Sequence, residues 1–252
     1  MAGANLREFA PIVGPCLWSR SHKFAVLNCL KTIGCTMFDE LFEGIEQALE
    51  PVRGYPPMAK GRVFVAFSGG ADSSALLHSA YISIKDRYEL LALHADHQLH
   101  RQSGAWRAHC QALTDSLGVP LIAETLSVSA EGNLEAAARE ARYEFFSRHL
   151  RSGDLLLLAH HQQDQLESIL LRLFQGRGVM PMRAQGALGA GQFARPFLHL
   201  DKHQLVDYLV SKDVGWVEDP SNQDLGFDRN FLRQRVTGEI LERWPTALGA
   251  VQ

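Results

Sequence analysis

The strongest constraint on the fold is an alternation of short apolar runs with amphipathic segments, which begins near residue 63. Runs such as VFVAFS (63–68) and LLALHAD (90–96) are apolar throughout, which is typical of strands buried on both faces. The segments between the runs carry apolar residues at helical spacing. We therefore predict an α/β, Rossmann-like fold in which helices cover both faces of a parallel sheet. The expected strands are 63–68, 90–96, 120–126, 155–161 and a short 195–198, and the expected helices are 74–84, 103–117, 133–150, 162–175 and 201–212.

Composition excludes several other classes of protein. Of the 252 residues, 46% are hydrophobic and 21% are charged, which is close to an average globular domain and unlike a disordered or collagen-like chain. Apolar runs stay far below the ~20 residues of a transmembrane helix, so we expect no membrane association. The four cysteines form no C-x-x-C pair, which argues against a zinc or iron–sulfur centre and favours a reducing compartment such as the cytoplasm.

Residues 1–36 differ from the rest of the chain. They hold four basic residues and one acidic residue, so they carry +3 while the remainder carries −6. We expect an N-terminal extension that is either not native or disordered, followed by one domain at 37–252. A start codon assigned too far upstream is the favoured interpretation, and a transit peptide or an ordered extension are the alternatives. A secretory signal is disfavoured because no clean apolar region follows a basic start.

A glycine-bearing loop follows the first expected strand. It consists of Ser68, Gly69, Gly70, Ala71, Asp72 and Ser73. Two glycines let the backbone turn sharply, and the amides of the following helix N-terminus suit an anion such as a phosphate group. A carboxylate at Asp72 would repel a phosphate unless a Mg²⁺ ion bridged the two, so Asp72 is the expected metal ligand. The alternative is a plain strand–turn–helix connection in which Asp72 caps the helix.

Other polar residues also fall at the carboxyl ends of expected strands, where ligands of parallel sheets bind. His94, Asp96 and His97 follow the second strand. Their spacing matches part of a metallohydrolase signature, but Ala92 stands where that signature needs histidine, so a substrate contact is favoured. His160, Asp164 and Glu167 follow the fourth strand at i, i+4 and i+7, which aligns them on one face of a helix. The alternative for this row is a solvated helix start, with His161 and Gln162 as fillers.

The loop S-G-G-A-D-S resembles the signature of the PP-loop, or N-type ATP pyrophosphatase, superfamily. Five ordered segments over roughly residues 60–248 are together similar to the tRNA(Ile)-lysidine synthetase family. They are HADHQLHRQS (94–103), NLEAAAREARYEFF (133–146), AHHQQDQLESILLRLFQGRG (159–178), RPFL (195–198) and EDPSNQDLGFDRNFLR (218–233).

This resemblance implies a function. The fold would be of the adenine nucleotide alpha hydrolase type, and 37–252 would be a PP-loop catalytic domain without the C-terminal tRNA-binding domains of many family members. The substrates would be ATP, tRNA(Ile) and L-lysine, with Mg²⁺. ATP would adenylate the 2-carbonyl oxygen of the wobble cytidine, and lysine would then displace AMP to form lysidine. A homodimer stays an open alternative.

The resemblance also implies roles for individual residues. Asp72, His160, Asp164 and Glu167 fall on functional positions of the family. The family's essential arginine falls on Arg139, with Arg142 as the alternative; either could instead be a surface partner of Glu135 or Glu140. Arg195, the segment 218–222 and Arg229 with Asn230 mark the end of the family's catalytic domain, as a loop that faces RNA or lysine or as a capped helix.

Three positions depart from the family pattern: Gln163 for an aspartate, His100 for a common arginine, and Pro181 for a glycine. We expect the glycine-rich segment 176–191 to be a mobile loop that closes over substrate. With −6 on residues 37–252, we also expect weak tRNA affinity for this chain alone. A nucleotide-binding module without turnover is the main alternative. A tRNA thiolase is disfavoured because only Cys110 lies within the domain, and a glutamine-dependent synthetase is disfavoured because we find no cysteine glutaminase domain in the sequence.

Overall fold

Six strands form one sheet in the computed structural model, which describes residues 38–50, 61–96, 103–127 and 134–251. The strands lie in the order β3-β2-β1-β4-β6-β5, and all neighbouring pairs are parallel except the edge pair β5–β6. This confirms the predicted α/β fold with a mainly parallel sheet. Their bounds are β1 (Arg62–Ala66), β2 (Glu89–Asp96), β3 (Leu121–Thr125), β4 (Leu155–Leu157), β5 (Gln185–Leu188) and β6 (Gly191–Ala194).

Two predictions about the fifth strand and its surroundings are wrong. The strand expected at 195–198 lies instead at β6, immediately before Arg195. The glycine-rich segment 176–191, expected to be a loop throughout, contains β5 and the turn of an antiparallel hairpin, whereas its closure over substrate stays a prediction. Gly189 has a φ of +57° in that turn, a conformation that glycine adopts without strain. The hairpin therefore uses the glycines for a tight reversal at the sheet edge.

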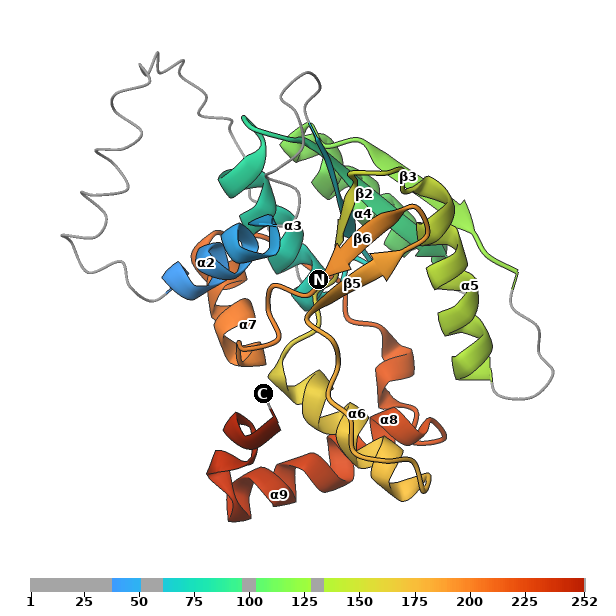
Figure 1. The fold of residues 1–252 in the computed structure, drawn as a ribbon, viewed down its shortest axis with the longest axis vertical. Coiled ribbons are helices and arrows are strands. Elements are labelled where there is room, and N and C mark those ends of the chain that lie inside the picture. The colour runs from blue at the N-terminus through green and yellow to red at the C-terminus, as the bar shows by residue number, and fades with distance from the viewer. Residues whose placement is uncertain (1–37, 51–60, 97–102, 128–133, 252) are drawn as a thin grey trace, which may run out of the picture. The chain divides into compact units, whose positions relative to one another are not determined.

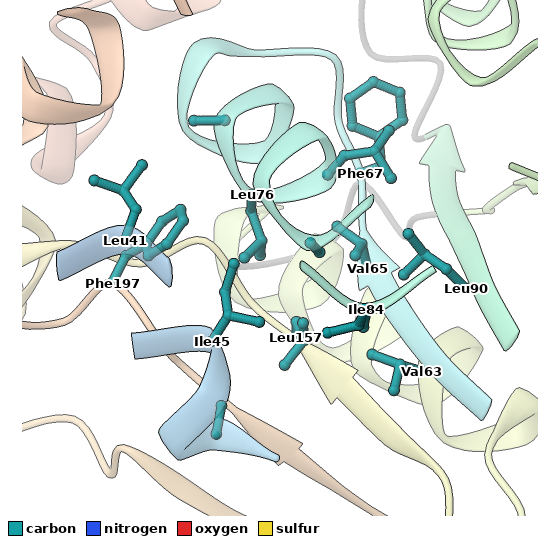
Figure 2. Close-up of a cluster of buried hydrophobic side chains, with 14 of the residues drawn as sticks. Leu41, Ile45, Val63, Val65, Phe67, Leu76, Ile84, Leu90, Leu157 and Phe197 are labelled. Carbon is teal, nitrogen blue, oxygen red and sulfur yellow. The ribbon is translucent and has the colours of Figure 1, made fainter. Parts of the chain in front are cut away.

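Helices cover both faces of the sheet because the strand residues alternate between two cores. Val63 and Val65 of β1 belong to one buried cluster, which α2, α3 and α7 complete, and Figure 2 shows part of it. Phe64 belongs to a second cluster with residues of α5. Figure 1 shows α2, α3 and α7 on one side of the sheet and α5 on the other. The helices are α2 (Asp39–Ala48), α3 (Ala71–Ile84), α4 (Ser103–Leu117), α5 (Leu134–His149), α6 (Gln162–Phe174), α7 (Lys202–Ser211), α8 (Asp228–Phe231) and α9 (Thr237–Arg243).

The chain after α7 packs against α6. A 3-10 turn, η3 (Pro220–Gln223), leads into α8, and a π-helical segment, η4 (Leu232–Val236), continues from α8 into α9. Both α8 and η4 contact α6, and Figure 1 shows α8 beside α6. Within the described ranges, no helix has the length and apolarity that a membrane crossing requires. The expected N-terminal extension, the start of the helix expected at 133, His97 and His100 lie outside the described residues.

Candidate active site

The turn that follows β1 requires glycine at position 69. Gly69 has a φ of +87°, a conformation that residues with a side chain rarely adopt. A Cβ atom there would also lie 2.8 Å from Sγ of Cys110, which is buried. The carbonyl of Gly69 accepts a hydrogen bond from the amide of Val217 at 2.9 Å. Backbone conformation and close packing therefore both explain the glycine that the sequence signature carries.

Serine hydroxyls hold this turn against the start of α3. Ser73 Oγ accepts from the amide of Ser68 at 3.2 Å and donates to the carbonyl of Gly70 at 3.1 Å. The helix begins at Ala71, and no described side chain caps it. The amides of its first turn, from Ala71 to Ser73, have no acceptor within the helix and lie at the positive end of its dipole. This arrangement suits the binding of a phosphate group.

A cavity of about 720 Å³ lies at the carboxyl ends of β1, β2 and β4, next to this turn. It is here called the main cavity. The expected residues Ser68, Gly70, Asp72, Ser73 and His160 line it. Segments far apart in the sequence complete the wall, with His94, Trp106, Arg142, Tyr143, Asp219, Asp224 and Phe227. Asp164, Glu167 and Arg139 are not among the residues that line it, although Asp164 lies within 3.5 Å of His161, which also approaches the lining residue Asp72.

Arg195 fixes the orientation of His160. Its Nε donates to Nδ1 of His160 at 3.1 Å, and its Nη2 donates to the hydroxyl of Tyr143 at 3.0 Å. Since Nδ1 accepts this hydrogen bond, the proton of the neutral ring must reside on Nε2. Burial is the main cause that lowers the pKa of His160 to about 3, with help from Arg195, Arg229 and Arg142 and against the effect of Asp164. His160 is therefore neutral at physiological pH and acts as a hydrogen-bond donor.

His161 connects Asp72 to Asp164. Its Nε2 lies 3.6 Å from Oδ2 of Asp72 and 3.5 Å from Oδ2 of Asp164, and only 1% of the residue is exposed. Burial would lower the pKa of His161, but the two carboxylates outweigh it and raise the pKa. The filler role considered for His161 in a solvated helix start is therefore wrong. The sequence does not distinguish the roles of the adjacent His160 and His161, because the backbone turn into α6 determines which carboxylates His161 contacts.

Asp164 and Glu167 share two arginines that follow α7. Arg233 donates from Nε to Oε1 of Glu167 at 2.7 Å, and Arg229 donates from Nε to Oε2 at 3.2 Å. Arg233 also lies 3.4 Å from Asp164, and the backbone amide of His161 donates to Asp164. Burial would raise the pKa of Asp164, but His161, His160 and Arg229 lower it to about 2. The pair of carboxylates therefore ties α6 to α8 and η4, a contact over more than sixty residues that spacing alone could not indicate.

The two candidate arginines of α5 face different cavities. Arg142 lines the main cavity and makes no ion pair with a described residue. Burial, together with the charges of Arg139 and Arg229, lowers the pKa of Arg142. Arg139 lies one helical turn earlier, over the ring of Tyr143 at 4.9 Å, and lines a second cavity. A partly buried cation without a counterion attracts an anion, so Arg142 is the arginine that can contact a ligand in the main cavity.

Asp72 has the properties of a magnesium ligand. Its Oδ1 atom is buried and finds no hydrogen-bond partner among the described residues, while Oδ2 faces His161. An unpartnered buried carboxylate oxygen is costly unless a cation or donor meets it. Mg²⁺ typically binds one or two carboxylates together with substrate phosphates, so a single carboxylate beside a phosphate-binding turn fits this ion. The described ranges contain no group of three or more His, Cys, Asp or Glu side chains that could hold a metal ion. Phosphate oxygens of a bound substrate would therefore have to supply further ligands to an ion at Asp72.

Gln163, the departure from the family pattern next to Asp164, has a structural role. Its Nε2 donates to Asp201 at 2.6 Å, and its Oε1 accepts from the amide of Lys202 at 3.1 Å. The side chain thus joins the start of α6 to the start of α7 and points away from the main cavity. An amide can donate and accept at once, which an aspartate cannot do.

Comparison with known proteins places these features in a family. A family model described as "PP-loop domain" matches residues 41–240. The tRNA(Ile)-lysidine synthase of Legionella pneumophila (strain Paris) is 42% identical over 193 residues, which are 75% of this chain and 45% of the relative. Those of Pseudomonas aeruginosa and Alkalilimnicola ehrlichii are 42% and 44% identical, over 81% and 73% of this chain and 46% and 42% of the relatives. The chain thus spans less than half the length of these relatives.

A solved structure supports the fold. A U34-tRNA thiolase from Methanococcus maripaludis superposes with a TM-score of 0.66 at 10% sequence identity, over 86% of this chain and 78% of the thiolase. At this low identity the likeness concerns the arrangement of strands and helices alone.

Proposed function

Since this chain belongs to the PP-loop domain family, we propose that it carries the catalytic site of a tRNA(Ile)-lysidine synthase. In this reaction ATP adenylates the 2-carbonyl oxygen of a cytidine, and L-lysine then displaces AMP to form lysidine. The observation that carries the proposal is the main cavity, which brings together free helix amides, Oδ1 of Asp72 and the cation of Arg142; neither Oδ1 nor Arg142 has a partner of opposite charge or a hydrogen-bond donor among the described residues. ATP, lysine and tRNA occur together in the cytoplasm, where we place the reaction.

The first half of the reaction needs charge stabilisation at the phosphates of ATP. The amides of Ala71 to Ser73 and the hydroxyl of Ser68 would hold the phosphates, and Arg142, which lines the same cavity, would offset their negative charge. Asp72 would hold Mg²⁺, which supplies Lewis-acid neutralisation of the phosphate oxygens when bound. The carbonyl oxygen of cytidine attacks the α-phosphorus, the bond to pyrophosphate breaks, and pyrophosphate leaves.

The second half needs a donor at the activated base and an acceptor for the proton of lysine. His160 directs Nε2–H into the main cavity, because Arg195 occupies Nδ1. This N–H donates to the adenylated group and holds it in place, but a ring in this state cannot also accept a proton at the same atom. The lysine amine attacks C2, the bond between C2 and the adenylated oxygen breaks, AMP leaves, and a carboxylate that lines the cavity accepts the proton of the amine. Asp219 and Asp224 are the cavity carboxylates contributed by the segment that precedes α8.

Replacing Arg195 should lower the rate of the reaction, because Arg195 selects the tautomer of His160. In Arg195→Met, Nδ1 of His160 loses its donor, so the neutral ring can place its proton on Nδ1 instead of Nε2. Burial, the main cause of the low pKa of His160, remains, so the ring stays neutral at pH 7.5. We expect kcat to fall about 10- to 30-fold at pH 7.5.

The control for this prediction is His160→Gln, whose side-chain amide donates and has no tautomer for Arg195 to select. In the background of His160→Gln, adding Arg195→Met should lower kcat much less than it does in the parent protein. An equal loss in both backgrounds would assign the effect to another group and contradict the role of Arg195. Thermal unfolding of each variant separates loss of activity from loss of fold.

The proposed function itself is tested by turnover. The protein is incubated with ATP, Mg²⁺, L-lysine and tRNA(Ile) that carries an unmodified wobble cytidine, and pyrophosphate release and the mass of the digested nucleoside are measured. We expect tRNA-dependent pyrophosphate release and a nucleoside heavier than cytidine by lysine minus water. Binding of ATP without pyrophosphate release under any condition would instead indicate a nucleotide-binding module and overturn the proposal.

A further inference from the structure

A second cavity, of about 460 Å³, lies between α5, α6 and the segment 177–183 that leads from α6 to β5. It is strongly basic, although residues 37–252 carry a net charge of −6. The acidic residues in its lining are Glu135 and Asp228. Its arginines, which define the arginine cleft, are Arg139, Arg172, Arg177, Arg183, Arg195 and Arg229.

Several of these cations have no carboxylate to neutralise them. Arg139, Arg177 and Arg183 form no ion pair with a described residue and are exposed to solvent. Arg172 donates to a backbone carbonyl, that of Gly178, which leaves its charge uncompensated. Like charges gathered in one concave surface repel one another and raise the local concentration of anions. The arginine cleft therefore favours the binding of an anionic ligand, since the described residues do not neutralise its positive charge.

The arginine cleft adjoins the main cavity. Tyr143 lines the main cavity, while Arg139 stacks on its ring and Arg195 binds its hydroxyl from the side of the cleft. Arg195 also contacts His160 of the main cavity. A nucleotide whose base enters the main cavity must leave its flanking phosphates outside, and the arginine cleft lies where such phosphates can continue.

Apolar side chains in the cleft favour a polynucleotide over a free anion. Met180 in the cleft lining is 57% exposed, and Leu171, Pro181 and Met182 also line the cleft. Arginines that bind phosphates, interleaved with exposed apolar side chains that stack on bases, are typical of surfaces for single-stranded nucleic acid. An inorganic anion would need the charges but not these apolar side chains.

We propose that the arginine cleft binds the phosphodiester backbone of single-stranded RNA and positions the strand beside the main cavity. The identity of the strand, which would be the anticodon loop, rests on the proposed function. RNA and free pyrophosphate both present phosphate groups to the arginines, so pyrophosphate is the alternative ligand that the test must distinguish.

The test measures binding without turnover. A fluorescently labelled anticodon stem–loop RNA is titrated with the full chain, without ATP or lysine, at several KCl concentrations starting from low salt. In Arg177→Ala/Arg183→Ala we expect affinity at low salt to fall on the order of 10-fold, and the slope of log K against log salt to become shallower by about 0.7 for each arginine removed.

The matched control is Arg87→Ala/Arg148→Ala, which removes two exposed arginines that pair with Glu46 and Glu124 outside the cleft. It lowers the net charge equally and should change both affinity and slope much less. Equal losses in the two double variants would reduce the effect to net charge and overturn the proposal. So would an unchanged RNA affinity accompanied by a loss of pyrophosphate binding in calorimetry, or a parent protein that binds no RNA at low salt.

The same measurements separate this inference from the proposed function. RNA binding that depends on Arg177 and Arg183, in a protein that forms no lysidine, would support the cleft and refute the synthase. If the protein formed lysidine but its RNA affinity did not change when these arginines were replaced, the synthase would be supported and the role of the cleft refuted. In an active protein, the cleft variant should raise KM for tRNA and leave kcat near that of the parent.

Discussion

Asp72→Asn should lower tRNA-dependent pyrophosphate release by about 10³-fold or more, which corresponds to about 4 kcal/mol of transition-state stabilisation. The substitution keeps the size of the side chain but removes its charge. Oδ1 of Asp72 is buried at the edge of the phosphate-binding turn and finds no partner in the part of the chain that the structure describes. An amide there is a poor Mg²⁺ ligand, so the growing charge on the phosphates is no longer offset. Initial rates with saturating ATP, lysine and tRNA measure the effect.

The mechanism predicts a second signature in ATP binding. For the parent protein, affinity for ATP should increase when Mg²⁺ is added, and for Asp72→Asn this increase should largely vanish. Asp115→Asn is the matched control, because Asp115 lies on the exposed face of α4, where its Oδ1 accepts from Gln111. Asp115→Asn should retain full activity. If Asp72→Asn kept normal rates and a normal response to Mg²⁺, Asp72 would have no part in the reaction.

Strongly patterned elements of this fold are predictable from sequence, and weakly patterned ones are not. β2 and α4 coincide closely with their expected ranges, because each has a continuous apolar run or a helical period. β5 and β6 have four residues each, contain glycine and pair at the sheet edge, so their pattern does not differ from that of a loop. The segment RPFL (195–198) is mostly apolar and was therefore expected to be the strand; Phe197 does pack in the core, but the segment forms a turn that follows β6.

Site residues divide in a similar way. The loop from Ser68 to Ser73 can be identified because its function depends on local backbone geometry, which glycine and serine encode at fixed spacing. Arg139 and Arg142 lie three residues apart on α5, so their side chains leave the helix in somewhat different directions, and both positions have plausible local partners. The structure directs Arg142 into the main cavity and Arg139 into the arginine cleft. Neither the sequence pattern of the family nor the helical period shows which arginine faces the main cavity and which faces the arginine cleft.

Contacts between distant segments are the least predictable. Arg195 lies 35 residues after His160 and Arg233 lies 66 residues after Glu167, so no periodic pattern links them. The sequence did mark both arginine segments, but as the end of a domain or a loop facing RNA. Their observed role is to hold the histidine and the carboxylates that the family pattern associates with chemistry.

Arg233→Met should destabilise the fold by about 2–3 kcal/mol, because it removes one partner of a buried ion pair. Glu167 is 1% exposed, and Arg233 supplies two of its three recorded hydrogen bonds, at 2.7 and 2.8 Å. With Arg233 absent, Arg229 alone compensates the carboxylate, and α6 loses its main link to η4. Unfolding in urea, followed by circular dichroism, measures the change in the free energy of unfolding.

A double-mutant cycle determines whether the pair or the single charges cause this loss. Glu167→Leu/Arg233→Met should cost less than the sum of its single variants, with a coupling of about 1–2 kcal/mol, because the double variant buries no unpaired charge. Arg235→Met is the control: Arg235 is exposed on the same segment, forms no recorded ion pair with a described residue, and should change stability by less than about 0.5 kcal/mol. Additive effects in the cycle would mean that Glu167 and Arg233 do not stabilise the fold as a pair. Glu167 would then be free to act on a ligand, as the family pattern implies, rather than to join α6 to η4.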